Sequence, residues 1–437
     1  MKWSRFNVLF KSKEDFYFLY NSRINSFFKV DKPLYDLLSS FKDGTIDISE
    51  VGQDVVNNMI QKKIIVNQND DNSYISQMEY LKRKRSFCCN DLSLVIAPTL
   101  NCNFKCPYCY EHDLPTKKMN HTTQDKLIDF INLHKNKTKK LSLYWHGGEP
   151  MLAFEEIKNI LTKIIEKTDI PLTSHQMVTN GYIFSKEICD FFKSTKLDYI
   201  QITVDGTKET HDKNRIHKSG ISTYNKIIEN IDLILEEMPD CNVGVRVNIH
   251  NANKGDYPII HEKLTERWNG KNCTVYPAFV LSHGGCNVSC LSSSEKSRFY
   301  IDLYHKYKMK NINFIPNLEV GSCSAIYENH YVIDPEGLLY KCWADFDIPE
   351  RIIGNLETGI NNWEYISEYT LGTDKFKDEK CLKCNIFPIC EGGCNRFRLE
   401  NKLYDTPYDV CPIDSPGLIN YLQIIYEQMA NKKDAIA

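Results

Sequence analysis

The sequence has no long apolar run and little excess of either charge. None of its hydrophobic stretches approaches the ~18 consecutive apolar residues of a membrane-spanning helix, and Met1 to Lys13 alternate apolar and charged side chains, unlike a secretion signal. The formal net charge is -3, which gives no general attraction to nucleic acid or to anionic membranes. We therefore expect a cytoplasmic protein that binds neither nucleic acid nor a membrane.

Internal repeats and low-complexity tracts are also lacking. The composition, 42% hydrophobic and 25% charged, is that of a globular protein without long disordered segments. Domains usually contain ~100 to 200 residues. A chain of 437 residues therefore indicates two or three domains.

Cysteine, in contrast, is abundant, with 17 residues. Disulfides are disfavoured in a reducing compartment, and a chain of this length does not need them to stabilise a core. Three of the cysteines lie between residues 102 and 109, and seven lie between residues 323 and 411. This clustering indicates metal or iron-sulfur ligation.

The middle of the chain alternates strand-like and helix-like segments in six units. The strands are expected at Ser93–Leu100, Leu141–His146, Gln176–Thr179, Tyr199–Val204, Val243–Ile249 and Val275–Leu281. The helices are expected at Thr122–His134, Phe154–Thr168, Ser185–Ser194, Thr223–Met238, Tyr257–Trp268 and Ser294–Tyr307. Such alternation predicts an α/β fold with a parallel sheet and helices outside it, and six units predict a partial TIM-like (β/α)6 barrel.

Residues 1–88 follow a different pattern, which is typical of a winged-helix-like domain. Short strands are expected at Phe6–Phe10, Phe16–Tyr20, Ser26–Val30 and Lys63–Val66, and helices at Pro33–Phe41, Ser49–Gln61 and Asn72–Arg85. A DNA-binding winged helix is the competing interpretation. However, this segment has 14 basic and 11 acidic residues, and four of the basic ones are Lys82 to Arg85. A nearly neutral domain suits a peptide better than phosphates.

Four motifs stand at the carboxyl ends of the first four predicted strands of the barrel. They are Cys102-x3-Cys106-x2-Cys109, His146-Gly147-Gly148-Glu149, Thr179-Asn180-Gly181 and Thr203-Val204-Asp205-Gly206. Reactive residues of βα barrels gather at this face, where the loops after the strands converge. Taken singly, the glycines would be an ordinary turn, and Asn180 and Asp205 could cap helices.

The Cys102, Cys106 and Cys109 spacing offers three thiolates on one loop. Three thiolates can hold three irons of a 4Fe-4S cubane and leave the fourth iron open for a cofactor or substrate. A zinc site is the alternative, but zinc requires four protein ligands and the loop offers no obvious fourth. We therefore favour an iron-sulfur cluster.

This C-x3-C-x2-C motif resembles the hallmark of the radical S-adenosylmethionine (SAM) superfamily. The resemblance implies that SAM binds the open iron and that a 5′-deoxyadenosyl radical abstracts hydrogen from a substrate. It also implies SAM contacts: Tyr108 beside the adenine, Gly147, Gly148 and Glu149 at the methionyl ammonium, Asn180 nearby, and Thr203 in the family's Ser-x-Asp-Gly position. Arg215 and Arg246 are both candidates for the SAM carboxylate, because arginine pairs with carboxylates in a bidentate manner.

The C-terminal array reads Cys323-x13-Gly337-x4-Cys342, Cys381-x2-Cys384-x5-Cys390-x3-Cys394 and finally Cys411. It resembles the seven-cysteine SPASM domain, which implies two auxiliary 4Fe-4S clusters and three clusters in all. The first would be held by Cys323, Cys342 and Cys394, and the second by Cys381, Cys384, Cys390 and Cys411. Two clusters need eight thiolates. Cys286 or Cys290 could complete the set, or one iron stays open or binds a substrate thiolate, and a zinc ribbon remains a competing interpretation.

Relatives with SPASM domains mostly modify peptides or proteins, and the N-terminal segment resembles the precursor-peptide recognition element of ribosomal peptide maturases. In those, a leader peptide adds a strand to a sheet edge. The resemblance implies a maturase that crosslinks side chains through a thioether, C-C or C-O bond, with an electron donor such as ferredoxin or flavodoxin. The expected domains are 1–88 for leader recognition, 89–310 for the barrel and 311–437 for the auxiliary clusters.

Two other functions remain open. Anaerobic sulfatase-maturating enzymes share the barrel and SPASM domain, but they start close to the first cluster and carry Asp directly after the cysteine matching Cys342. Here that residue is Trp343, with Asp345 nearby. A non-catalytic iron-sulfur protein for peptide binding or electron transfer is the other alternative, and the intact cysteine triad and Gly-Gly-Glu argue against it. No catalytic acid or base is identified.

Overall fold

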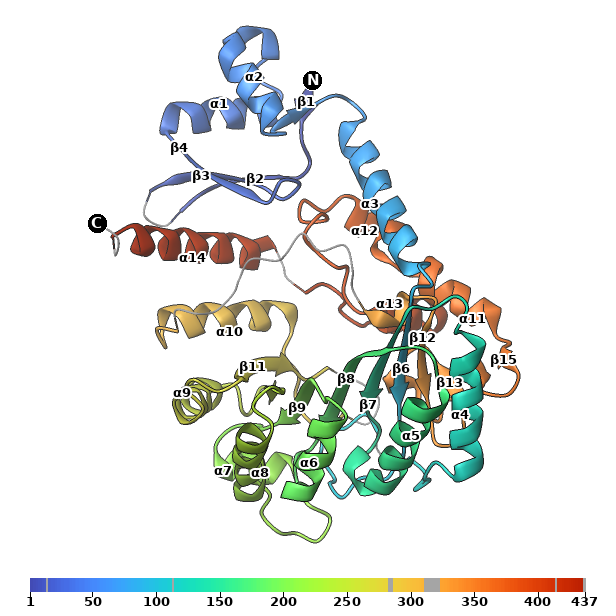
Figure 1. The fold of residues 1–437 in the computed structure, drawn as a ribbon. Coiled ribbons are helices and arrows are strands. Elements are labelled where there is room, and N and C mark those ends of the chain that lie inside the picture. Colours follow the sequence, from blue (N-terminus) through green and yellow to red (C-terminus); the bar gives the residue numbers. More distant parts are fainter. Residues whose placement is uncertain (13–14, 112–113, 282–285, 310–322, 413–414, 435–437) are drawn as a thin grey trace. The chain divides into compact units, whose positions relative to one another are not determined.

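The chain forms two compact units. The computed structural model describes residues 1–12, 15–111, 114–281, 286–309, 323–412 and 415–434 (Figure 1). Unit 1 contains Met1–Phe87, Ser292–Cys323 and Glu368–Ala437, and unit 2 contains Cys88–Leu291 and Ser324–Ser367.

Unit 2 is built on one ten-stranded sheet. Its parallel part has neighbouring strands in sequence order: β6 (Asp91–Ile96), β7 (Lys140–Trp145), β8 (Leu172–Thr179), β9 (Tyr199–Thr203), β10 (Asn242–Ile249) and β11 (Cys273–Phe279). On the other side of β6 the sheet continues with β12 (His330–Ile333), β13 (Leu338–Tyr340), β14 (Gly354–Asn355) and β15 (Gly359–Ile360). The predicted α/β fold with a partial parallel barrel is confirmed.

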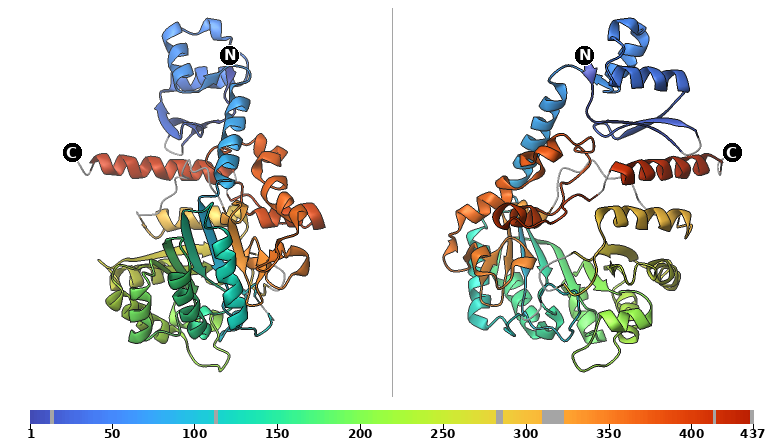
Figure 2. Two further views of the ribbon diagram at one scale, coloured as in Figure 1. Left: turned by 45° about the vertical axis from the view of Figure 1, so that its right-hand side comes forward. Right: turned by 180° about the vertical axis from the view of Figure 1, so that it is seen from behind.

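Helices follow the parallel strands and lie along the outer face of the sheet (Figures 1 and 2). They are α4 (His121–Leu133), α5 (Phe154–Lys167), α6 (Lys186–Ser194), α7 (Lys208–Asn214), α8 (Tyr224–Glu237) and α9 (Tyr257–Arg267). Buried apolar side chains alternate with less buried ones along the strands: in β7, Leu143 and Trp145 are fully buried and Tyr144 between them is half-buried. All the strands predicted for the barrel are present with ends shifted by a few residues, whereas the short α7 was not predicted.

Unit 1 begins with an antiparallel sheet of β2 (Asn7–Lys11), β3 (Tyr17–Asn21) and β4 (Ser26–Val30), as the sequence predicted. The helices α1 (Lys32–Lys42), α2 (Gln53–Gln61) and α3 (Asp70–Ser86) follow, and β5 (Ile65–Val66) pairs with β1 (Lys2–Trp3). Helix α1 begins where Asp31 accepts a 2.9 Å hydrogen bond from the Leu34 amide, and Pro33 occupies its first turn.

The N-terminal sheet is buried on both faces. One face packs Leu19 against Leu38 and Met59 of α1 and α2. The other packs Phe18 into a cluster with Leu422 of α14 (Ser415–Asp434), so the two ends of the chain share a core within unit 1.

The boundary between the units at 87/88 lies one residue from the predicted boundary at 88/89, whereas no unit boundary lies at 310/311. Strand β12 extends the barrel sheet, because it pairs with β6 over His330–Ile333. Helix α10 (Ser293–His305) belongs to unit 1, where it contacts α14. The functional division into a recognition domain, a barrel and an auxiliary-cluster domain stays a prediction.

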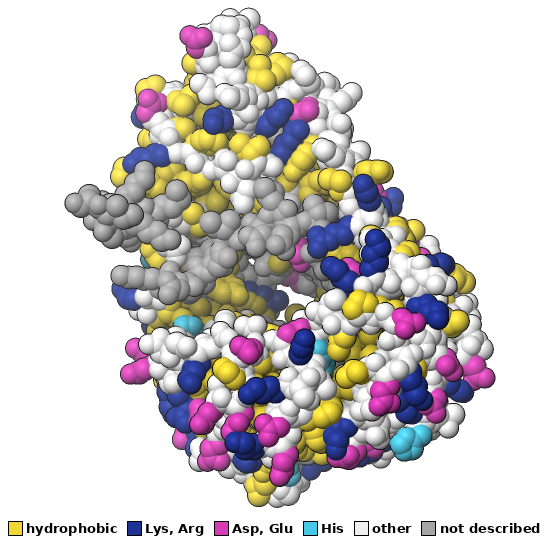
Figure 3. Space-filling view, in the orientation of Figure 1, with side chains coloured by type: hydrophobic (Ala, Val, Ile, Leu, Met, Phe, Trp, Pro, Cys, Tyr) yellow, Lys and Arg dark blue, Asp and Glu magenta, His cyan; other side chains and the backbone are white. Residues whose placement is uncertain are grey.

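Over the described part of the chain, no helix is both long and apolar enough to cross a bilayer. On the face shown in Figure 3, Lys and Arg side chains alternate with Asp and Glu over the helices of unit 2. This mixture agrees with the small net charge of -3.

Asn230 on α8 positions the loop after β8, and its replacement tests that contact. Its buried amide donates to the carbonyls of Gly181 and Tyr182 at 2.8 and 2.9 Å. Asn230→Ala leaves both carbonyls without this donor, so we expect the free energy of unfolding to fall by about 2 kcal/mol. Urea unfolding followed by circular dichroism measures the loss. Glu229→Ala, at an exposed position of the same helix, is the control, and an equal loss in both variants would contradict the assignment.

Candidate cofactor site

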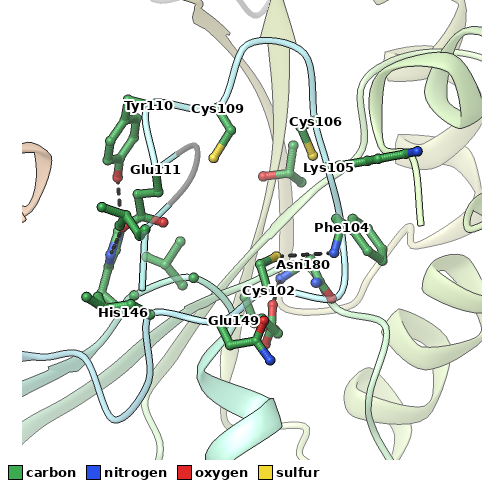
Figure 4. Close-up of a pocket in the computed structure, with 18 of the residues that line it drawn as sticks. Cys102, Phe104, Lys105, Cys106, Cys109, Tyr110, Glu111, His146, Glu149 and Asn180 are labelled. Carbon is green, nitrogen blue, oxygen red and sulfur yellow. Dashed lines mark hydrogen bonds and ion pairs between the residues drawn. The ribbon is translucent and has the colours of Figure 1, made fainter. Parts of the chain in front are cut away.

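Three thiols of one loop face a common space. The loop follows β6, and Figure 4 shows Cys102, Cys106 and Cys109 with their sulfur atoms turned toward the space that it encloses. A second segment braces the loop from outside. The Lys105 amide donates to the Ile216 carbonyl at 2.8 Å, and the Lys218 amide donates to the Asn103 carbonyl at 2.8 Å.

Gly147 and Gly148 lie directly against the backbone of the cysteine loop. A Cβ on Gly148 would stand 2.4 Å from the carbonyl oxygens of Leu100 and Asn101. A Cβ on Gly147, whose φ is +115°, would stand 2.4 Å from the carbonyl oxygen of Thr99. From the sequence, these glycines are expected to contact SAM. The structure gives a further reason, since any side chain would push the cysteine loop away from the end of β7.

Glu149 connects three segments of the site. Its buried carboxylate accepts hydrogen bonds from Thr179 Oγ1 at 2.6 Å, the Asn180 amide at 2.6 Å and the Met151 amide at 3.0 Å. Asn180 in turn donates from Nδ2 to Asn103 Oδ1 at 2.7 Å. Burial raises the pKa of Glu149, and these hydrogen bonds oppose the rise by stabilising the carboxylate.

These groups surround a cavity of about 380 Å³ at the carboxyl ends of β6 to β9. Of the residues predicted to contact SAM, six line it together with the three cysteines: Gly147, Gly148, Glu149, Asn180, Thr203 and Arg215. The predicted residues Tyr108 and Arg246 are not among the residues that line it.

Tyr108 and Arg246 belong to a buried network behind the cavity. The Tyr108 hydroxyl donates to Asp205 and accepts from Asn248 Nδ2 at 3.2 Å, while Arg246 Nε donates to Asn248 Oδ1 at 2.8 Å. Burial raises the pKa of the Asp205 carboxyl, and the positive charge of Arg215 opposes that rise. In this structure Tyr108 joins the ends of β9 and β10.

Arg215 is the better placed of the two candidate arginines. It lines the cavity, its Nη1 donates to the Tyr108 hydroxyl at 3.4 Å, and its buried Nε has no hydrogen-bond partner among the described residues. Burial disfavours its charge, yet Cys106, Tyr108 and Asp205 together raise the pKa of Arg215 above its usual value. A guanidinium that stays charged and has an unused donor fits a carboxylate ligand.

The residues fit a cubane cluster better than a single ion. Among the side chains that the structure describes, no three of His, Cys, Asp or Glu are arranged to hold one metal ion. A cubane takes one thiolate per iron, so its ligands need not meet at one point. Burial raises the pKa of Cys102 and of Cys109 to about 12, so both thiols require a cationic ligand to ionise at neutral pH.

Sequence reasoning missed one group at the cavity wall. Tyr110 Oη lies 3.3 Å from His146 Nε2, and the ring of Trp343 stacks on His146 with centroids 5.4 Å apart. Glu111, the next residue after Tyr110, also lines the cavity. Burial lowers the pKa of His146 to about 4, so its imidazole is neutral at pH 7, and burial raises the pKa of Glu111 well above its usual range. The sequence Cys109-Tyr110-Glu111, which continues the cysteine motif, could have indicated this group.

The C-terminal cysteines are distributed over both units and form no disulfide among the described residues. Cys381, Cys384, Cys390, Cys394 and Cys411 belong to unit 1, with Cys323 at the end of one of its segments, and Cys342 belongs to unit 2. Arg398 Nη2 donates to Cys381 Sγ at 3.1 Å, and the Gly392 amide donates to Cys390 Sγ at 3.3 Å. In unit 2, the sulfur atoms of Cys286 and Cys290 are 3.8 Å apart.

Comparison with known proteins identifies the central segment. Residues 96–264 match the sequence profile of the Radical SAM superfamily, and this span contains the cysteine triad and most of the cavity wall. The chain is an enzyme with a radical SAM domain. Members of this family bind a 4Fe-4S cluster and SAM, which agrees with the donor set of the cavity.

Three similar proteins extend beyond that segment. A cysteine-type anaerobic sulfatase-maturating enzyme of Clostridium perfringens is 25% identical over 341 residues, covering 70% of this radical SAM enzyme and 90% of that protein. The solved structure of anSMEcpe with AdoMet and the Cp18Cys peptide has a TM-score of 0.61 at 18% identity and covers 79% of this chain and 100% of its own. Streptococcus suis SuiB bound to its precursor peptide SuiA has a TM-score of 0.53 at 15% identity, covering 95% and 99%. At these identities the structural likeness shows the fold.

Gly148→Ala tests whether the glycine contact holds the cluster loop. The added methyl must displace the carbonyls of Leu100 and Asn101, so we expect the iron bound after anaerobic reconstitution to fall below about half of the wild-type amount. Iron and sulfide analysis with visible absorption measures this. Gly255→Ala adds the same methyl where nothing lies within 4 Å and should leave the iron content unchanged. A full cluster in Gly148→Ala would refute this role.

Proposed function

We propose that this enzyme is a cytoplasmic maturase that crosslinks side chains of a ribosomally made precursor peptide. The observation that carries the proposal is the combination of a radical SAM cavity in unit 2 with an open strand edge beside an apolar groove in unit 1. The two features supply the two requirements of such an enzyme, a place for chemistry and a place for the leader peptide.

The groove lies between β4 and the helices α1 and α2. It has a volume of about 310 Å³, and its wall includes Phe28 and Val30 of β4, Leu34 of α1, and Val55 and Met59 of α2. Within the described residues, β4 pairs with β3 on one side and has no strand on the other. Its outer backbone groups can therefore pair with an extended peptide whose apolar side chains enter the groove.

The cavity of unit 2 supports the cofactor assignment. Cys102, Cys106 and Cys109 would hold the cluster, while Glu149 and Arg215 carry the charges complementary to the ammonium and carboxylate of an amino acid such as the methionyl part of SAM. When bound, the reduced cluster and SAM supply a radical that abstracts hydrogen. The protein binds and orients both partners and keeps water from the reacting carbon.

We further propose two auxiliary clusters, as the SPASM resemblance implies, and an electron donor such as a ferredoxin or flavodoxin. The ligands Cys381, Cys384, Cys390 and Cys411 belong to one unit, in which Arg398 contacts Cys381 and Lys375 donates to the Cys390 carbonyl at 2.7 Å. Positive charge beside a thiolate-bound cluster offsets part of its negative charge.

Sulfatase maturation is the second candidate, since an enzyme of that name is 25% identical over most of its length. Two contacts argue against it. The position directly after Cys342 is occupied by Trp343, whose ring stacks on His146. The nearby Asp345 is fully buried and accepts a 2.7 Å hydrogen bond from Arg351 Nη1, so its carboxylate is committed to an ion pair.

Co-expression with the short open reading frames encoded beside the gene tests the proposal. We expect mass spectrometry to find one peptide that has lost two hydrogens per crosslink, and fragmentation then locates the bond. Cys106→Ala should abolish both the crosslink and 5′-deoxyadenosine formation, because it removes a cluster ligand. Cys273→Ala, which removes a thiol outside every proposed ligand set, should preserve them. If no neighbouring peptide changed in mass, a protein substrate would be favoured instead.

Val55→Asp tests the groove as the leader site. The residue is 38% exposed, so the change is tolerated by the fold, but a bound peptide would have to desolvate the new carboxylate. We expect the dissociation constant of the labelled precursor peptide, measured by fluorescence anisotropy, to rise at least about tenfold. Ile60→Asp is the matched control, because Ile60 is 37% exposed on the same helix and does not line the groove. Equal affinities of the two variants would exclude the groove.

A further inference from the structure

His146 and Glu111 present two unused polar atoms at one side of the cofactor cavity. His146 Nδ1 and Glu111 Oε1 are both buried, and neither has a hydrogen-bond partner among the described residues. They lie 3.7 Å apart, which is too far for a hydrogen bond between them. Figure 4 shows Tyr110, Glu111 and His146 together at this side of the cavity.

The imidazole ring is held in place by its neighbours. Tyr110 Oη meets its Nε2 at 3.3 Å, and Trp343 covers its face with an interplanar angle of 15°. These contacts occupy Nε2 and one face of the ring. Nδ1 is directed to the part of the cavity wall that contains Glu111. A buried polar atom without a partner is unfavourable, so the arrangement favours a ligand that makes hydrogen bonds to both atoms.

The distance between His146 Nδ1 and Glu111 Oε1 limits which ligand can bind both atoms. A single oxygen or sulfur atom can stand within hydrogen-bond distance of two atoms that are 3.7 Å apart. A neutral imidazole has one donor and one acceptor nitrogen, and a hydroxyl or thiol can both donate and accept. In the tautomer in which the Tyr110 hydroxyl donates to Nε2, Nδ1 carries the hydrogen, and an O-H or S-H group can accept from Nδ1 and donate to Glu111 Oε1. An ammonium or a carboxylate would leave one of them unsatisfied.

We propose that His146 and Glu111 bind the hydroxyl or thiol of the peptide residue whose oxygen or sulfur enters the crosslink. This inference rests on the proposed function and deepens it, because it assigns the acceptor residue of the peptide to serine, threonine, tyrosine or cysteine. The bond formed is then a thioether or a C-O bond: the carbon loses a hydrogen atom to the SAM-derived radical, the O-H or S-H group loses its proton, and the remaining electron would pass to an iron-sulfur cluster. Trp343 acts as a positioning residue that holds the ring of His146.

The test uses the precursor peptide found by co-expression and a version in which the predicted acceptor residue is alanine. Wild-type enzyme should bind the first about fivefold more tightly than the second, as one hydrogen-bonded group allows. His146→Phe keeps the aromatic stack and should abolish this discrimination. His146→Asn places an amide near the position of Nδ1 and should restore it, whereas His146→Gln reaches the position of Nε2 and should not.

Turnover gives a second readout. The amount of crosslinked peptide per SAM cleaved should fall at least tenfold in His146→Phe and recover to within about threefold of wild type in His146→Asn. His134→Phe is the matched control, since His134 also packs against aromatic rings but lies at the end of α4, outside the cavity, with its Nδ1 bonded to the Phe130 carbonyl at 2.9 Å.

Several outcomes would overturn the inference while leaving the proposed function intact. A C-C crosslink would show that no heteroatom takes part. Wild-type behaviour of His146→Phe, or equal rescue by Asn and Gln, would show that Nδ1 binds nothing on the peptide. Loss of iron in all three variants would make His146 a structural residue. If no neighbouring peptide were bound or modified at all, the proposed function itself would fail.

Discussion

The contact between the cysteine loop and the Gly147-Gly148 turn is the constraint on which the cavity depends. Two loops that follow neighbouring strands approach so closely that there is no room for a Cβ atom between them. The thiols and the Glu149 carboxylate are thereby fixed relative to each other by backbone packing, and long flexible side chains play no part. A cofactor that must touch a cluster and a carboxylate at once requires this kind of rigidity.

A second layer of polar contacts surrounds that backbone contact. Glu149 accepts from the residues at the end of β8, and Tyr108 links the loop to Asp205 after β9. The segments that follow β6, β7, β8 and β9 thus all contribute to the polar contacts that hold the site together. Burial raises the pKa values of Cys102 and Glu149 and lowers that of His146, so it favours the neutral form of each side chain. In such an environment a bound cation or a pair of opposite charges is strongly stabilised.

The sequence predicted much of this because the signals were local. The alternation of apolar strands and amphipathic helices predicted β6 to β11, and the strand-end motifs predicted the three cysteines together with Gly147, Gly148, Glu149, Asn180 and Thr203 of the cavity wall. What it missed depends on residues far apart in the chain. Tyr108 bonds to Asp205, 97 positions away, and Trp343 stacks on His146. The pairing of β12 with β6 was also not predicted, because the sequence of neither strand indicates which strand lies beside it.

The shared core of unit 1 has a consequence for biosynthesis. The strands β2 to β4 leave the ribosome before the barrel, yet one of their faces is covered by α14, which is made after it. Until α14 has been made, Phe10, Phe18 and Tyr20 lack their contacts with this helix. Contacts so distant in the chain are slow to form, and an exposed apolar sheet face is a target for chaperones or for aggregation. The core of the N-terminal sheet is therefore completed only after the barrel segment that lies between these two segments in the sequence has been made.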